Sequence, residues 1–147
     1  MEFYYLRLFL MFLIPLLTSL LVTPQVIKMA HHINAIDVPK DERRVHTKPM
    51  PRIGGLAIYI SFLLAILLFG NFSKELLSIV IASFIIIVLG LFDDVKPVPA
   101  KIKFLLHIIS ASIVVLYGNL LISNIGILGF TINLGYYAIP LTILFIV

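Results

Sequence analysis

The sequence contains no cysteine and few charged side chains. The absence of cysteine excludes a disulfide framework and a thiolate metal site. Charged residues make up 12% of the 147 positions, whereas hydrophobic residues make up 61%, and the mean hydropathy is +1.15. A soluble domain is far less apolar, because its surface must face water. The composition therefore predicts an integral membrane protein.

The basic residues lie close together in the sequence. Eleven Lys and Arg against seven Asp and Glu give a net charge of +4, a balance that by itself could indicate a nucleic-acid partner. Nine of the eleven basic residues, however, lie in residues 24–52 and 93–103. Short basic segments between apolar runs are typical of cytoplasmic loops. The charge therefore predicts a membrane topology and no nucleic-acid partner.

The apolar segments predict an all-α integral membrane fold with four complete transmembrane helices and a truncated fifth. A hydrocarbon core of roughly 30 Å requires about 20 helical residues per span. Because cytoplasmic loops carry the excess of Lys and Arg, the N-terminus is expected outside. The prediction is a single multispanning membrane domain with spans at residues 3–23, 53–69, 76–92, 104–121 and 138–147.

Two features near the C-terminal end complete this topology. Glycines and β-branched residues from Ile125 to Gly135 predict a short external hairpin before the fifth span. Residues 138–147 then supply about half the length that a bilayer requires. A terminal carboxylate inside hydrocarbon would be very costly. We therefore expect the chain to be the N-terminal part of a longer protein.

Two adjacent aspartates, Asp93 and Asp94, directly follow the third predicted span. The membrane boundary penalises desolvated charge, and the C-terminal end of a helix already carries partial negative charge, so a cation is expected beside them. Adjacent carboxylates can bind Mg²⁺ through oxygen, with water and substrate phosphates completing the shell. The alternative is that both carboxylates are merely solvated.

Lysines near the start of the fourth span predict a phosphate site. Lys101 and Lys103 lie where the helix dipole favours anions. Carboxylates beside lysines at a membrane surface suit a phosphorylated lipid and a nucleotide bridged by a metal. Lysines in a cytoplasmic loop also follow from topology alone. Gly54-Gly55 could serve either close packing or the approach of backbone to a phosphate, and both interpretations remain open.

Three segments carry the motifs of the chain: Asp37-Val38-Pro39, the segment from Arg43 to Ala57, and Gly90-Leu91-Phe92-Asp93-Asp94 with Lys103. These motifs resemble those of the polyprenyl-phosphate N-acetylhexosamine-1-phosphate transferases, glycosyltransferase family 4. The resemblance covers nearly the whole chain from Thr23 onward. The Pro-Arg-x-Gly-Gly form is similar to the branch that starts teichoic acid, O-antigen or related envelope glycans. The phospho-MurNAc-pentapeptide transferases of peptidoglycan synthesis usually have Thr-Pro-Thr-Met-Gly-Gly there and are the second choice.

The resemblance implies a reaction, a cofactor and a location. It implies Mg²⁺-dependent transfer of N-acetylhexosamine-1-phosphate, GlcNAc-1-phosphate first, from a UDP-sugar to undecaprenyl phosphate, with release of UMP. Mn²⁺ is the alternative ion. The protein would work at the cytoplasmic face of the inner membrane as a multi-pass protein in the lipid bilayer. A homodimer is one option for its assembly.

The same resemblance assigns roles to individual residues. Asp93 and Asp94 would be the catalytic acidic pair, which orients or deprotonates the lipid phosphate near the metal and contributes metal ligands. Lys103 would neutralise phosphate charge. The loop that borders the phosphate site would contribute His46, Lys48 and Arg52. Such chemistry is coherent, since an ionised phosphate attacking a pyrophosphate mainly needs charge neutralisation and alignment.

The chain departs from the family pattern in two ways. His107 stands four residues after Lys103, where the family usually has Gln. The family's second acidic motif, an Asn-rich Asp-Gly segment that supplies the principal metal ligand, would lie beyond Val147, as would a later histidine-containing loop. The 147 residues alone are therefore expected to be inactive.

Two other classes of protein are alternatives to a transferase. A transporter or channel fragment would carry ionisable residues along an ion path, but apart from Arg7 and His107 the predicted spans carry none. A noncatalytic membrane adaptor that binds anionic lipid would explain the basic loops. It would not explain Asp93 and Asp94.

Overall fold

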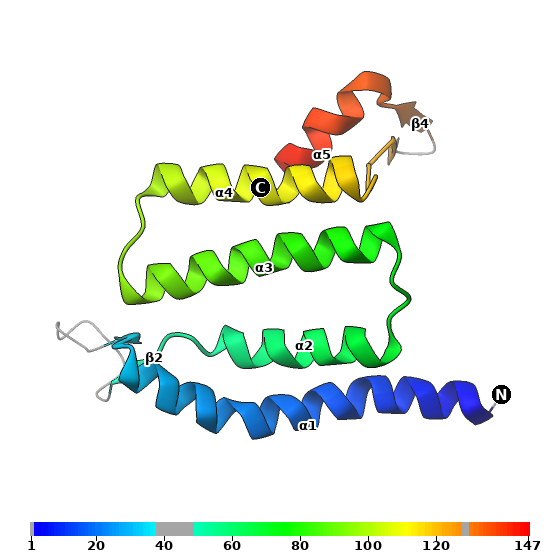
Figure 1. Ribbon diagram of the computed structural model, residues 1–147. Helices are drawn as coiled ribbons and strands as arrows, with labels where there is room; N and C mark the ends of the chain where they lie inside the picture. Colours follow the sequence, from blue (N-terminus) through cyan, green and yellow to red (C-terminus); the bar gives the residue numbers. More distant parts are fainter. Residues whose placement is uncertain (1, 38–48, 128–129) are drawn as a thin grey trace. The chain divides into compact units, whose positions relative to one another are not determined.

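The computed structural model describes residues 2–37, 49–127 and 130–147 and is mostly helical there (Figure 1). The chain forms two compact units. The first unit contains Met1–Asn71 and Gly90–Pro97, and the second contains Phe72–Leu89 and Val98–Val147. Helix α3 (Lys74–Val95) contributes to both units, its last turn to the first.

Helix α1 (Glu2–His32) is longer than the sequence suggested. We predicted that the first helical segment ends at residue 23, and this bound was wrong, because the helix continues through Pro24 to His32. Apolar helices tolerate an internal proline where hydroxyl side chains and neighbouring groups bond the affected backbone. The residue before Pro24 is bonded within the helix, since Thr23 Oγ1 donates to the carbonyl oxygen of Ser19 at 2.6 Å.

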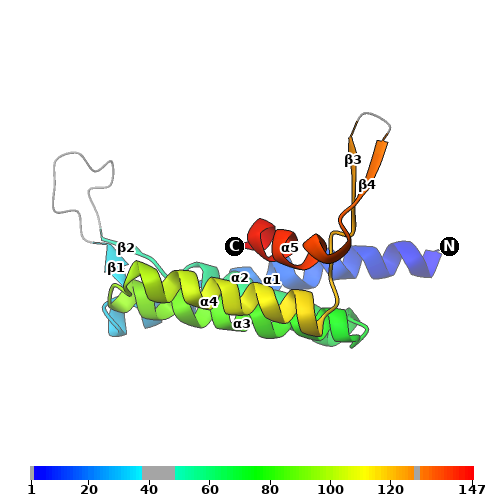
Figure 2. The ribbon, with the colours of Figure 1, turned by 90° about the horizontal axis from the view of Figure 1, so that it is seen from above.

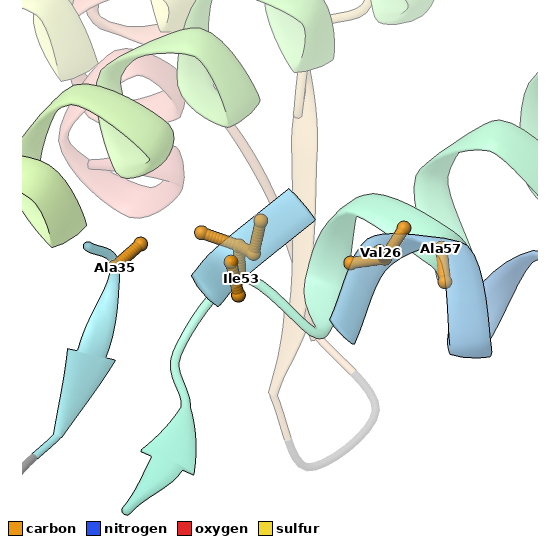
Figure 3. Packing of buried hydrophobic residues seen from close by; sticks show 5 residues of the cluster. Val26, Ala35, Ile53 and Ala57 are labelled. Carbon is orange, nitrogen blue, oxygen red and sulfur yellow. The ribbon is translucent and has the colours of Figure 1, made fainter. Parts of the chain in front are cut away.

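The first unit is built on α1 and α2 (Gly55–Phe69), which lie side by side and run in opposite directions (Figure 1). Small side chains at their contact let the two backbones approach closely. Leu91, from the last turns of α3, packs against the same cluster. The cluster, part of which Figure 3 shows, consists of Val26, Ala30, Ala35, Ile53 and Ala57.

Arg7 links α1 to α2 at the other end of this helix pair. Its Nη2 donates a hydrogen bond of 3.0 Å to the carbonyl oxygen of Phe69, at the C-terminal end of α2. The last carbonyl groups of a helix have no partner within the helix and carry partial negative charge. The guanidinium satisfies one of them and is favoured there by its charge.

Helix α3 begins and ends where local chemistry directs it. The Ser73 hydroxyl accepts a hydrogen bond from the backbone N–H of Leu76 at 3.3 Å, as an N-terminal capping residue does. The helix ends at Val95, just before Pro97 and Pro99, because proline cannot continue a helix. Asp93 and Asp94 therefore lie in its last turn.

The second unit contains α4 (Ala100–Ser112), which runs directly into a π-helix, Ile113–Tyr117. We predicted that this segment would continue to about residue 121, but it ends at Tyr117. Asn119 has a φ of 53°, a left-handed conformation that commonly terminates helices. Helix α5 (Ala138–Ile146) packs against both α4 and the π-helix.

The predicted hairpin is confirmed. Strands β3 (Asn124–Ile127) and β4 (Phe130–Asn133) pair antiparallel, with Ile125 opposite Ile132, and lie side by side in Figure 2. A short 3₁₀-helix, Gly135–Tyr137, leads into α5. That the hairpin lies outside the membrane stays a prediction.

By length and composition, three helices in the described part of the chain could cross a membrane. They are Phe3–His32, Lys74–Val95 and Ala100–Tyr117, and the shorter apolar helices are Gly55–Phe69 and Gly135–Ile146. These helices fit a membrane protein. The number of spans and their orientation stay predictions.

Replacing Gly118 by Ala should destabilise the second unit by about 1–3 kcal/mol. A Cβ at this position would overlap the Ser78 side chain and come within 2.6 Å of the carbonyl oxygen of Val114. The measurement is the thermal midpoint of helix loss, followed by circular dichroism in detergent. Gly90→Ala is the matched control, since its Cβ would meet nothing within 4 Å. Equal midpoints for the two variants would contradict this packing.

Candidate functional site

Arg52 is held by a short ribbon that the sequence did not predict. Strand β1 (Ile36–Asp37) pairs antiparallel with β2 (Met50–Pro51). Directly after β2, the backbone N–H of Arg52 donates to the carbonyl oxygen of Ala35 at 3.0 Å. Its Nη2 donates to Asp37 Oδ1 at 2.7 Å. The backbone bond fixes the position of Arg52 in the chain, and the bond to Asp37 fixes the direction of its guanidinium group.

The Arg52–Asp37 ion pair positions a charge more than it stabilises the fold. The two side chains are 43% and 38% exposed, and exposed ion pairs contribute about 0–1 kcal/mol. A guanidinium has five N–H donors, so a bond to one carboxylate oxygen does not exhaust them. Arg52 can therefore bond a phosphate while it stays paired with Asp37.

A double-mutant cycle of Asp37→Asn and Arg52→Gln should give a coupling energy below about 1 kcal/mol in thermal unfolding. The coupling should shrink further in concentrated salt, because salt screens exposed charges. A coupling of several kcal/mol, unchanged by salt, would show instead that the pair holds the fold together.

The two aspartates of α3 lie in the same unit as Arg52. Leu91, which packs on the cluster containing Ala35 and Ile53, precedes Asp93 by two residues. Ala35 accepts the hydrogen bond from Arg52, and Ile53 follows Arg52 in the chain. The acidic turn and the ribbon are thus both attached to one apolar cluster. Asp93 and Asp94 are each half-buried.

Helical geometry identifies the neighbours of each aspartate on α3. Adjacent helical residues point about 100° apart. Residues three and four apart are neighbours on a helix surface, so Asp94 lies beside Leu91 and Gly90, and Asp93 lies beside Gly90 and the buried Leu89. A Cβ built at Gly90 would meet nothing within 4 Å among the described residues. Each aspartate therefore has one neighbour on the open side of the helix, Gly90, and one apolar neighbour.

The start of α2 is also open. Gly54, the residue before the helix, is exposed, and a Cβ there would meet nothing within 4 Å in the described part of the chain. Close packing therefore does not account for glycine at this position. A helix N-terminus with a bare backbone, two residues after Arg52, suits an anion.

The remaining predicted residues are placed elsewhere or lie outside the described part. Lys103 is half-buried in the first turn of α4, whereas Lys101 in the same turn is exposed. Both belong to the second unit, so the structure does not bring them into one unit with the aspartates. His46 and Lys48 lie outside the described residues.

The carboxylates of this unit suit a hard cation that is held mainly by water and substrate phosphates. Residues 2–37, 49–127 and 130–147 contain no group of three or more acidic, histidine or cysteine side chains suited to hold a metal ion. Mg²⁺ does not need such a cage, because it commonly keeps several waters and binds through one or two carboxylates plus substrate phosphates. Asp93 and Asp94 meet that requirement.

Asp37 was missed as a site residue. Asp37 had been noted only as part of a motif, because a partner fifteen residues away in sequence is revealed by strand pairing and not by spacing. An acid shortly before a long loop and an arginine at its end would have been the available signal.

The fold and the site define a multi-pass helical membrane protein with an acidic pair at a helix end and a positioned arginine. Residues 76–147 match the sequence model of glycosyl transferase family 4. A Bacillus subtilis relative, named probable undecaprenyl-phosphate N-acetylglucosaminyl 1-phosphate transferase, is 40% identical over 143 residues, which are 96% of this chain. A Mycolicibacterium smegmatis relative, named decaprenyl-phosphate N-acetylglucosaminephosphotransferase, is 35% identical over 99 residues, 61% of this chain and 24% of that protein.

These matches confirm the resemblance read from the motifs: the chain belongs to glycosyl transferase family 4. It spans 40% of the length of the Bacillus subtilis relative. No solved structure gives a significant match.

Proposed function

We propose that this chain forms part of a transferase that moves GlcNAc-1-phosphate from UDP-GlcNAc to undecaprenyl phosphate and so starts a cell-envelope glycan. The observation that carries the proposal is the 40% identity to the Bacillus subtilis relative over 96% of the chain, together with that relative's name. The acidic pair and the positioned Arg52 supply charges of both signs in one unit, as a reaction between two phosphates requires.

In the proposed reaction, an oxygen of the lipid phosphate attacks the phosphorus that carries the sugar. The bond between the two phosphates of the UDP-sugar breaks, and UMP leaves with its electrons. The lipid phosphate is already ionised near neutral pH, so Asp93 and Asp94 act mainly by orienting it and by accepting any remaining proton. Arg52 and the bare backbone before α2 hold phosphate oxygens, and Lys103 neutralises the charge that develops.

Mg²⁺ would be held by Asp93 and Asp94 together with substrate phosphates and would supply charge neutralisation. We propose that the active face is cytoplasmic, where the two basic segments of the sequence are expected. Both statements rest on the donor set and the charge pattern of this chain.

A chimera tests this function directly. In it, residues 1–147 replace the matched region of the Bacillus subtilis relative, and membranes are assayed for transfer of radiolabelled GlcNAc from UDP-GlcNAc to undecaprenyl phosphate. Transfer in Mg²⁺ that is lost in EDTA and restored by Mg²⁺ is expected. Transfer only from UDP-MurNAc-pentapeptide would instead support the peptidoglycan reaction. No transfer from either donor, in a chimera that folds and inserts, would overturn the proposal.

A further inference from the structure

A cavity in the second unit has no role in the proposed reaction. It has a volume of about 330 Å³ and is lined from α3, α4, the π-helix and α5. Most of its wall consists of isoleucine, alanine and valine side chains, and its polar lining comes from Ser83, His107 and Ser110. An apolar wall with a few polar groups at this volume is typical of small-molecule sites, which occupy about 300–1,000 Å³.

Ser110 distinguishes this cavity from ordinary packing space. Its side chain is 4% exposed, and its Oγ makes no hydrogen bond within the described residues. Other hydroxyls on these helices donate to a carbonyl three or four residues earlier, as Ser83 does to Val80 and Ser112 does to Ile108. A buried polar atom without a partner is uncommon in native proteins and calls for a bonding partner from outside.

The cavity is lined by residues near the middle of apolar helices, where a hydrogen-bond partner for a buried hydroxyl is hard to replace by water. Its lining residues on α3 and on α4 with the π-helix lie near the middle of segments that are long and apolar enough to cross a membrane. Hydrocarbon offers no water to bond an unsatisfied group. A small molecule that bonds to Ser110 would therefore have to dissolve in the membrane.

The lining residues also indicate that the bound molecule is uncharged. Among the described residues, no Asp, Glu, Lys or Arg lines the cavity. A phosphate or other anion would be desolvated there without a fixed cation, at high cost. His107 and the two serines can both donate and accept hydrogen bonds, which suits a hydroxyl group. Next to the cavity the helix is in π form, a distortion that is frequent at functional sites.

We propose that this cavity binds a neutral, single-chain lipid alcohol, with its hydroxyl group bonded to Ser110 and its alkyl chain along the apolar wall. This binding is independent of the transferase proposal, since it uses neither the aspartates nor Arg52.

The test is photolabelling of the full 147-residue chain in lipid nanodiscs. The probe is hexadecan-1-ol with a diazirine near the hydroxyl, and the comparison probe is the same molecule without the hydroxyl. Mapped by peptide mass spectrometry, the alcohol should label residues 79–86 and 107–114 roughly fivefold more than the alkane, as one net hydrogen bond provides. Ser110→Ala should abolish this preference.

Ser112→Ala is the matched control, because the Ser112 hydroxyl is bonded to its own helix and does not line the cavity. It should keep the full preference, and circular dichroism should show unchanged helix content in both variants. Equal labelling by the two probes would overturn the proposal, as would a preference that survives Ser110→Ala. Cross-links from this segment to a second copy of the chain, in place of lipid, would overturn it too.

Discussion

Replacing either Asp93 or Asp94 by Asn should lower GlcNAc-1-phosphate transfer by the chimera at least 10²-fold. The substitution keeps the size of the side chain and removes the charge that orients the lipid phosphate and accepts a proton. Charge-stabilising and acid–base groups each typically contribute 10²-fold or more to rate. Initial rates of lipid-linked product formation, at saturating Mg²⁺, provide the measurement.

Glu75→Gln is the matched control, because Glu75 is the exposed acid in the first turn of the same helix. It should leave the rate within twofold of the unaltered chimera. Retained transfer in either aspartate variant would remove that residue from the catalytic set.

Replacing Lys103 by Gln should produce the second large loss, about 10²-fold in transfer rate. The side chain is half-buried in the first turn of α4, where the helix dipole adds to its attraction for phosphate. Because the interaction strengthens as charge develops on the phosphates, the loss should fall mainly on kcat. The measurement is kcat and KM for UDP-GlcNAc and for the lipid phosphate.

Lys101→Gln gives the matched comparison. Lys101 is in the same turn but exposed, and two residues of separation point the side chains about 200° apart. It should change the rate less than twofold, as expected for a lysine that serves topology alone. Equal losses for the two lysines would indicate general surface charge and contradict a specific role for Lys103.

The sequence predicted the helical membrane class and the hairpin, because those depend on local patterns. Apolar run length indicates a membrane helix. The end of the first helix was predicted at residue 23, but apolar helices tolerate an internal proline such as Pro24. The end of the fourth apolar segment was placed too late, because the apolar run to Leu121 was followed past Gly118-Asn119, residue types that commonly end helices.

The site was predicted in its charges and missed in its contacts. Charged residues are few in this chain, so sequence reasoning readily identified Asp93, Asp94 and Arg52 as site candidates. The bond between Arg52 and Asp37, and the shared support of Leu91 and Ile53, depend on which segments pack together. That Ser110 Oγ has no hydrogen-bond partner among the described residues could not be predicted either, because the nearby Ser112 is bonded to its own helix.

The most direct test of the central claim is the identity of the nucleotide released. The chimera is incubated with UDP-GlcNAc, undecaprenyl phosphate and Mg²⁺, and nucleotide and lipid products are quantified together. Transfer of sugar-1-phosphate predicts UMP in equal amount to a lipid pyrophosphate sugar, with both products lost in Asp93→Asn. Release of UDP would mean that sugar alone is transferred, and that result would contradict the account.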